Sequence, residues 1–155
     1  MRKSLMLVTA AAMAACGSSH TPSAPAVYFL LTANPMQVTG ALCTGCGAGS
    51  SEKEALTTLM IQEAAGLSGA VTLIDMSLRE TGTNAVIGAG SFDGPAVARL
   101  AGTNRLAAHG TLNVTCGVHY PPSVTGRTAV LTYVVTVTED NGPQTSSTIT
   151  VNVTT

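Results

Sequence analysis

The feature that most constrains the fold is a two-residue alternation of apolar and polar side chains in the C-terminal part of the chain. It runs through residues 111–120, 129–138 and 149–154. The apolar positions are Leu112, Val114, Cys116, Val118, Tyr120, Ala129, Leu131, Tyr133, Val135, Val137, Ile149, Val151 and Val153. Because successive side chains of a strand point to opposite faces, each segment predicts a strand with one buried face. The sequence Glu139-Asp-Asn-Gly-Pro143 predicts the turn of a hairpin between the last two strands.

Further strands are predicted from β-branched and aromatic runs that are bounded by turn residues. They cover 27–33, 36–42 as an edge strand after Asn34-Pro35, 71–79 and 85–92. Asp93 and Gly102 are typical cap residues of a helix, so a short helix is expected near 94–101.

Residues 51–66 fit two interpretations. Ser51 and Glu54 form a capping-box pattern that favours a helix, whereas Leu59 and Ile61 alternate with more polar neighbours and favour a strand. We favour a strand over 55–63.

About seven short strands with turns between them predict an all-β fold, an antiparallel β-sandwich that forms one domain over 27–155. The hairpin Val135-Thr-Val-Thr-Glu-Asp-Asn-Gly followed by Ser147-Thr-Ile-Thr-Val-Asn-Val153 resembles the closing strands of bacterial immunoglobulin-like and fibronectin type III-like domains. This resemblance implies an immunoglobulin-like sandwich. Members of these families serve as adhesion, spacer or ligand-binding modules.

The N-terminal residues 1–15 have the pattern of a secretory signal peptide. Arg2 and Lys3 precede an apolar run at 5–12, which is shorter than the roughly 20 residues that span a bilayer. Ala14-Ala15-Cys16 resembles the lipobox of bacterial lipoproteins. The resemblance implies lipidation of Cys16 and attachment to a membrane of the bacterial cell envelope, and Gly17 favours the outer membrane. The alternative is ordinary signal cleavage nearby.

Residues 16–26 then form the lipidated cysteine and a flexible tether, because they are small, polar and interrupted by Pro22 and Pro25. Without Arg2 and Lys3 the chain has five basic and eight acidic residues, a net charge of −3. This charge excludes a basic surface for nucleic acid. The scarcity of aromatic residues weighs against a third hypothesis, a carbohydrate-binding module.

Cys43, Cys46, Cys116 and His119 form a C-x-x-C and a C-x-x-H pattern. Together they have the ligand types of a zinc site, but Cys116 and His119 are expected on opposite faces of their strand. Export favours disulfides, so we expect Cys43 or Cys46 to bond to Cys116. A Cys43–Cys46 bond is the second possibility, and a thiol-redox or zinc-binding protein that uses all four residues is the alternative function.

The sequence contains no G-x-S-x-G motif, and no catalytic triad or acid/base pair can be assigned in it. We therefore expect a non-catalytic protein without a cofactor. It would act through its surface as a structural, adhesive or ligand-binding module, with an unidentified protein or glycan as partner.

Overall fold

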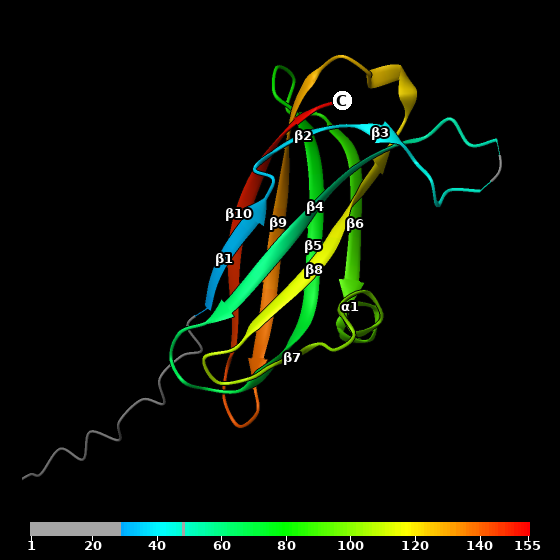
Figure 1. Ribbon diagram of the computed structural model, residues 1–155. Coiled ribbons are helices and arrows are strands. Elements are labelled where there is room, and N and C mark those ends of the chain that lie inside the picture. The colour runs from blue at the N-terminus through cyan, green and yellow to red at the C-terminus, as the bar shows by residue number, and fades with distance from the viewer. Residues whose placement is uncertain (1–28, 48) are drawn as a thin grey trace, which may run out of the picture.

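The computed structural model describes residues 29–47 and 49–155. The predicted signal peptide, Cys16 and the tether lie outside these residues, as do residues 27 and 28 of the predicted domain. The described chain forms two packed β-sheets with one short α-helix (Figure 1). The predicted all-β sandwich is thus confirmed.

The first sheet is built around strand β4 (Lys53–Glu63). One side of β4 pairs with β8 (Thr111–Tyr120), and the other side pairs with β1 (Phe29–Asn34) and β3 (Ala41–Leu42). Alternate residues of β4, including Leu59 and Ile61, are fully buried. The strand interpretation of 55–63 is confirmed, because the burial of alternate residues requires an extended backbone.

The second sheet has five main strands. Their order is β2 (Gln37–Thr39), β10 (Gln144–Thr154), β9 (Thr128–Glu139), β5 (Gly69–Glu80) and β6 (Val86–Asp93), and β7 (Arg105–Leu106) also pairs with β5. All neighbours are antiparallel except β2 and β10, which are parallel. The prediction of a purely antiparallel sandwich is wrong for this one pair of strands.

The chain crosses from the first sheet to the second between Asn34 and Gln37. A single edge strand over 36–42 was therefore the wrong prediction: β2 belongs to the second sheet and β3 to the first. Pro35 has no backbone N–H to donate, so it cannot extend the ladder of β1. The carbonyl oxygen of Met36 instead accepts a hydrogen bond of 3.1 Å from the backbone N–H of Asn152 on β10.

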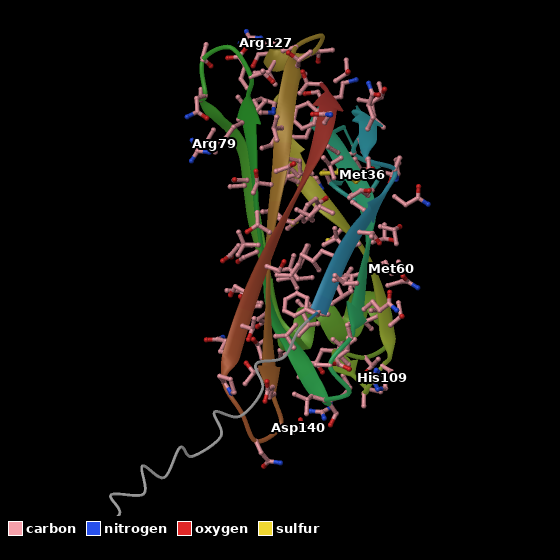
Figure 2. The ribbon with its side chains drawn as sticks, turned by 90° about the vertical axis from the view of Figure 1, so that its left-hand side faces the viewer. Met36, Met60, Arg79, His109, Arg127 and Asp140 are labelled. Carbon is pink, nitrogen blue, oxygen red and sulfur yellow. A yellow bond between two sulfur atoms is a disulfide. The ribbon has the colours of Figure 1, made fainter. Side chains whose placement is uncertain are left out.

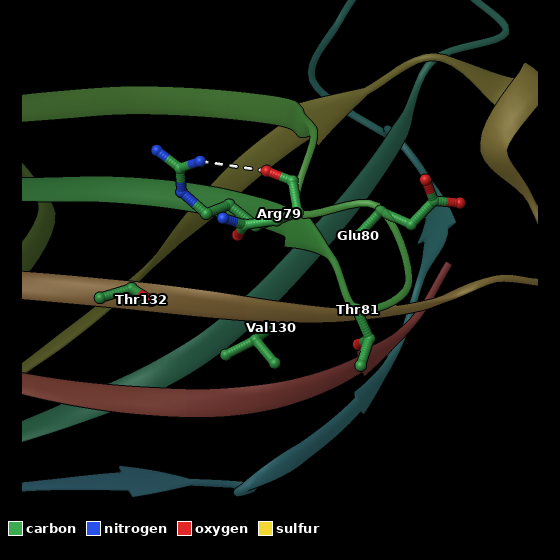
Figure 3. A pocket seen from close by; sticks show the side chains of 6 residues that line it. Arg79, Glu80, Thr81, Val130 and Thr132 are labelled. Carbon is green, nitrogen blue, oxygen red and sulfur yellow. Dashed lines mark hydrogen bonds between the residues drawn. The ribbon is translucent and has the colours of Figure 1, made fainter.

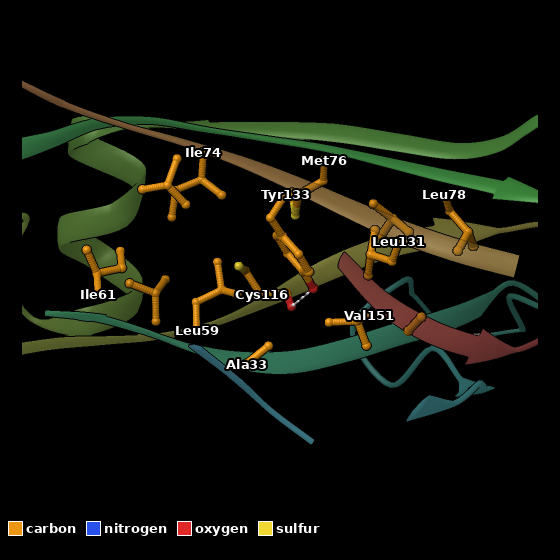
Figure 4. Packing of buried hydrophobic residues seen from close by; sticks show 14 of the residues in the cluster. Ala33, Leu59, Ile61, Ile74, Met76, Leu78, Cys116, Leu131, Tyr133 and Val151 are labelled. Atoms are coloured by element: carbon orange, nitrogen blue, oxygen red, sulfur yellow. Dashed lines mark hydrogen bonds between the residues drawn. The ribbon is translucent and has the colours of Figure 1, made fainter. Parts of the chain in front are cut away.

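The pairing corresponds to an immunoglobulin-type division of strands. β1, β4 and β8 take the places of strands A, B and E, and β5, β9 and β10 take those of C, F and G. Inward-facing residues of both sheets form one core (Figure 4). The core includes all the apolar positions predicted for 111–120 and 129–138, while Ile149 packs against its border.

The helix α1 (Gly94–Ala101) is confirmed where it was predicted. The carboxylate of Asp93 accepts a hydrogen bond of 2.8 Å from the N–H of Ala96, and Gly102 ends the helix with a φ of 80°. Val97 is fully buried. The helix lies against β5 and β6 of the second sheet and β8 of the first, at the lower end of β6 in Figure 1.

The strand directions define two ends of the sandwich. The proximal end holds Phe29 and the loops 64–68, 102–110 and 140–143. The distal end holds residues 43–47 and 49–52, the loops 81–85 and 121–127, the short 3₁₀ helix η1 (Pro122–Val124) and Thr155 (Figure 1). The 11 residues of β4 run from one end to the other, a distance of about 33 Å at the usual rise per residue. Among the described residues, no helix has the length and apolar character needed to cross a bilayer.

Candidate functional site at the distal end

The distal end carries a group of sulfur and nitrogen atoms that we call the Cys–His cluster, made of Cys43, Cys46 and His119. One ligand atom from each residue lies within 4.8 Å of the other two. Cys43 follows β3, and its backbone N–H donates a hydrogen bond of 2.9 Å to the carbonyl of Glu52. His119 comes from β8, so the cluster joins a loop to a strand of the first sheet.

Cys43 and Cys46 are joined by a disulfide, with their Cα atoms 5.6 Å apart. The preferred prediction, a bond from one of them to Cys116, was wrong. The turn through Thr44 and Gly45 brings the two nearby cysteines together, whereas Cys116 lies in the interior between the sheets.

Cys116 has a free thiol that is 3% exposed. Burial among apolar side chains raises its pKa to about 12. The thiol is therefore protonated at neutral pH, and it is a poor nucleophile and a poor metal ligand. The register between β4 and β8 is continuous from Lys53 to Gln62, so no bulge at Gly117 rotates Cys116 outward. The four-residue zinc hypothesis is corrected accordingly: Cys116 and His119 point to opposite faces, as the alternation predicted.

His119 lies on the outer face of the first sheet, opposite Glu54 on the neighbouring strand. The two residues are register partners on β4 and β8. The Nε2 atom of His119 lies 3.5 Å from the Sγ atom of Cys43 and 3.8 Å from a carboxylate oxygen of Glu54. The side chain of Glu54 is 12% exposed and that of His119 is 54% exposed. The imidazole is thus positioned between a sulfur and a carboxylate, with one side open to solvent.

A second feature of the distal end is a pocket of about 310 Å³ on the outer face of the second sheet (Figure 3). Its lining consists of Arg79, Glu80, Thr81, Asn84, Val130 and Thr132. The guanidinium of Arg79 donates a hydrogen bond of 3.1 Å to the carbonyl oxygen of Asn84. Within the described residues, no carboxylate lies within ion-pair distance of Arg79, and the carboxylate of Glu80 is paired with Arg127 at 2.8 Å. The pocket therefore offers the guanidinium of Arg79 beside hydroxyl and amide groups, together with the carboxylate of Glu80 that Arg127 neutralises.

No sequence pattern pointed to the main buried acid, Glu63, which is 1% exposed at the proximal end. Its carboxylate accepts backbone hydrogen bonds from Ala65 at 2.6 Å, Gly66 at 2.9 Å and His109 at 2.7 Å. Burial alone would raise the pKa of Glu63, but the N–H groups of His109, Ala65, Leu67 and Gly66 hold it below its ordinary value. Glu63 therefore ties two loops together, which is a structural role.

No protein-family model matches this chain, and no curated protein matches it. A solved structure similar to the chain is the X-ray structure of Northeast Structural Genomics Consortium target SoR45, with a TM-score of 0.54 and 8% sequence identity. The alignment covers 83% of this chain and 86% of that one. At this identity the likeness shows the fold alone. The comparisons thus identify no enzyme family for the chain.

Proposed function

We propose that this chain is an exported bacterial protein, anchored in the cell envelope by lipid on Cys16, that acts without catalysis as a structural, adhesive or ligand-binding module. The observation that supports this proposal is the separation of the two ends. The described chain begins at Phe29, on the proximal end, while the Cys–His cluster and the Arg79 pocket lie on the distal end.

An anchor on Cys16 would leave residues 17–28 between the lipid and the first described strand. Because a tether attached at Phe29 holds the proximal end nearest the membrane, the distal end would be directed toward the surroundings. In Figure 2, Arg79 and Arg127 lie at this distal end, and His109 and Asp140 lie at the opposite one. The outer membrane is the proposed location.

Two exposed surfaces support a role in binding. The Arg79 pocket is within the size range of small-ligand sites, and its guanidinium suits a ligand with an anionic group. Its lining has no aromatic ring on which a sugar could stack, which disfavours a carbohydrate ligand there. The outer face of the first sheet exposes Leu30, Leu56 and Met60, large apolar side chains of the kind found in contact surfaces.

Membrane fractionation of cells that express the Cys16→Ser variant tests the anchor. We expect the wild-type chain to stay in the membrane fraction through a high-salt wash and to leave it in detergent, because acyl chains bind through buried CH₂ groups rather than charge. The Cys16→Ser variant should leave the membrane fraction. The matched control is Cys43→Ser with Cys46→Ser, which also removes sulfur but should remain bound. A Cys16→Ser variant that stays firmly in the membrane would contradict the anchor.

A further inference from the structure

The Cys–His cluster has ligand atoms whose spacing suits a tetrahedral metal centre. Zinc binds thiolate sulfur and imidazole nitrogen at distances that place these two atoms about 3.6 Å apart in a tetrahedron. The Sγ atom of Cys43 and the Nε2 atom of His119 are 3.5 Å apart. These two ligands therefore need almost no movement to bind one ion.

A fourth ligand can come from the neighbouring strand through a movement of Glu54, whose carboxylate lies outside the group of ligand atoms that are within 4.8 Å of one another. A carboxylate oxygen of Glu54 lies 3.8 Å from the same Nε2 atom, close to the roughly 3.4 Å expected for nitrogen and oxygen ligands of one zinc ion. Glu54 and His119 are held opposite each other by the β4–β8 ladder. Ligands on paired strands are better fixed than ligands on loops, so this half of the site is preorganised.

The other half of the site lies on a loop that has room to adjust. In the disulfide the two sulfur atoms are bonded to each other, whereas two thiolates on one zinc ion lie about 3.8 Å apart. The C-x-x-C spacing of Cys43 and Cys46 is the usual spacing of such a pair. Apart from its chain neighbours, no atom of the described residues lies within 4 Å of the position that a Cβ atom on Gly45 would take, so the turn is open to solvent at this residue.

We propose that reduction of the Cys43–Cys46 disulfide converts the distal end into a zinc site with Cys43, Cys46 and His119 as ligands and Glu54 as the fourth. A dithiol reductant transfers two electrons and two protons to the disulfide, which yields two thiols while the dithiol becomes a disulfide. Zinc then replaces the two thiol protons, and neutral His119 binds through Nε2. The disulfide and the zinc-bound form exclude each other, so the site responds to the redox state around it.

Access to the disulfide favours this exchange. Cys46 is partly exposed, whereas Cys43 is 9% exposed beside His119. An incoming thiolate therefore reaches the Sγ atom of Cys46 more readily, and Cys43 departs as the thiolate. That thiolate forms within 3.5 Å of His119, which can stabilise it by hydrogen bonding.

Cobalt titration of the purified full-length chain tests the proposal, because Co²⁺ occupies zinc sites and gives thiolate charge-transfer and tetrahedral d–d absorption. The chain is compared in the oxidised form and after anaerobic reduction. We expect one equivalent of Co²⁺ to bind only to the reduced form and one equivalent of Zn²⁺ to displace it. Oxidation should release the metal and restore the Cys43–Cys46 bond.

Single substitutions distinguish metal binding by these four side chains from a general effect of reducing the protein. The matched control is Cys116→Ala, which removes the third described thiol and should leave the affinity unchanged. Cys43→Ser, Cys46→Ser and His119→Gln should each weaken zinc binding at least tenfold, and Glu54→Gln should weaken it several-fold, in chains whose circular dichroism is unaltered. Equal binding by the reduced wild type and by the Cys43→Ser, Cys46→Ser double variant would overturn the proposal, as would unchanged affinity in His119→Gln. The membrane anchor is a separate proposal that these results do not touch.

Discussion

Tyr133 on β9 donates a hydrogen bond of 3.0 Å to the carbonyl oxygen of Cys116 on β8, and this bond links the two sheets through the core (Figure 4). Tyr133 is fully buried. Burial, with the nearby Cys116 thiol as a smaller cause, raises the pKa of Tyr133 far above its ordinary value. The hydroxyl is therefore always protonated and always a donor at physiological pH.

Replacing Tyr133→Phe should lower the free energy of unfolding by about 1–3 kcal/mol, because the buried carbonyl of Cys116 loses its partner. Urea unfolding measures this loss. Tyr120→Phe is the matched control: the Tyr120 hydroxyl is buried without a hydrogen-bond partner among the described residues, so its removal should be neutral or stabilising. Equal losses in the two variants would contradict the assigned role of the Tyr133 bond.

Replacing Glu63→Gln should destabilise the protein by about 1.5–3 kcal/mol at pH 7, because a charged acceptor of several buried N–H groups is lost. The folded-state pKa of Glu63 is lowered, so its contribution is present above the unfolded-state pKa of about 4.3 and is lost as the pH falls through the folded value. The difference between the variant and the wild type should therefore shrink in acid. Urea unfolding at pH 7 and at pH 3 measures it, with Glu52→Gln in an exposed loop as the control.

Removing the disulfide by Cys43→Ser with Cys46→Ser should cost no more than about 2 kcal/mol, because the bond closes a very short loop. A bond from this loop to Cys116 would close a loop of about seventy residues. By the same chain-entropy relation it would stabilise the protein by roughly 4 kcal/mol. Thermal unfolding of the double variant distinguishes these values. Alkylation gives an independent check: in the oxidised chain Cys116 should react only after denaturation, and a peptide map that shows Cys116 in a disulfide would refute the pairing.

Much of the fold could be predicted from local sequence. The alternation around Leu59, Val114 and Val135 gives strands because each segment buries one face only, and Asp93 with Gly102 bounds the helix through backbone hydrogen bonds close in sequence. The crossing at Pro35 could not be predicted, because it depends on which sheet offers the next free edge.

The site was less predictable than the fold. The preferred disulfide was inferred from the export of the chain and the burial of Cys116, but the bond formed where the turn at Gly45 allowed it. Alternation did predict that Cys116 and His119 face opposite ways. The pairing of Glu54 with His119 is set by the register of β4 and β8, which no short stretch of sequence specifies.

An anchor on Cys16 would hold the proximal end of the sandwich at the membrane and the distal end away from it. This orientation is measured by energy transfer from a dye on a single lysine to acceptors in the bilayer surface. In the lipidated chain reconstituted in vesicles, Lys53→Arg removes the only lysine after Cys16. Into that background Asn141→Lys places a label at the proximal end, and Ser123→Lys places one at the distal end. Any dye that also reacts with the amino group of Cys16 contributes the same energy transfer in both variants, so the difference between them comes from the lysine label.

The two labelled ends are separated by about the length of β4, roughly 33 Å. We expect stronger transfer from position 141 than from position 123. Once Cys16→Ser releases the chain from the vesicles, transfer from both positions should be weak and equal. Equal transfer from the two positions in the anchored chain, or stronger transfer from position 123, would show that the distal end does not lie away from the membrane.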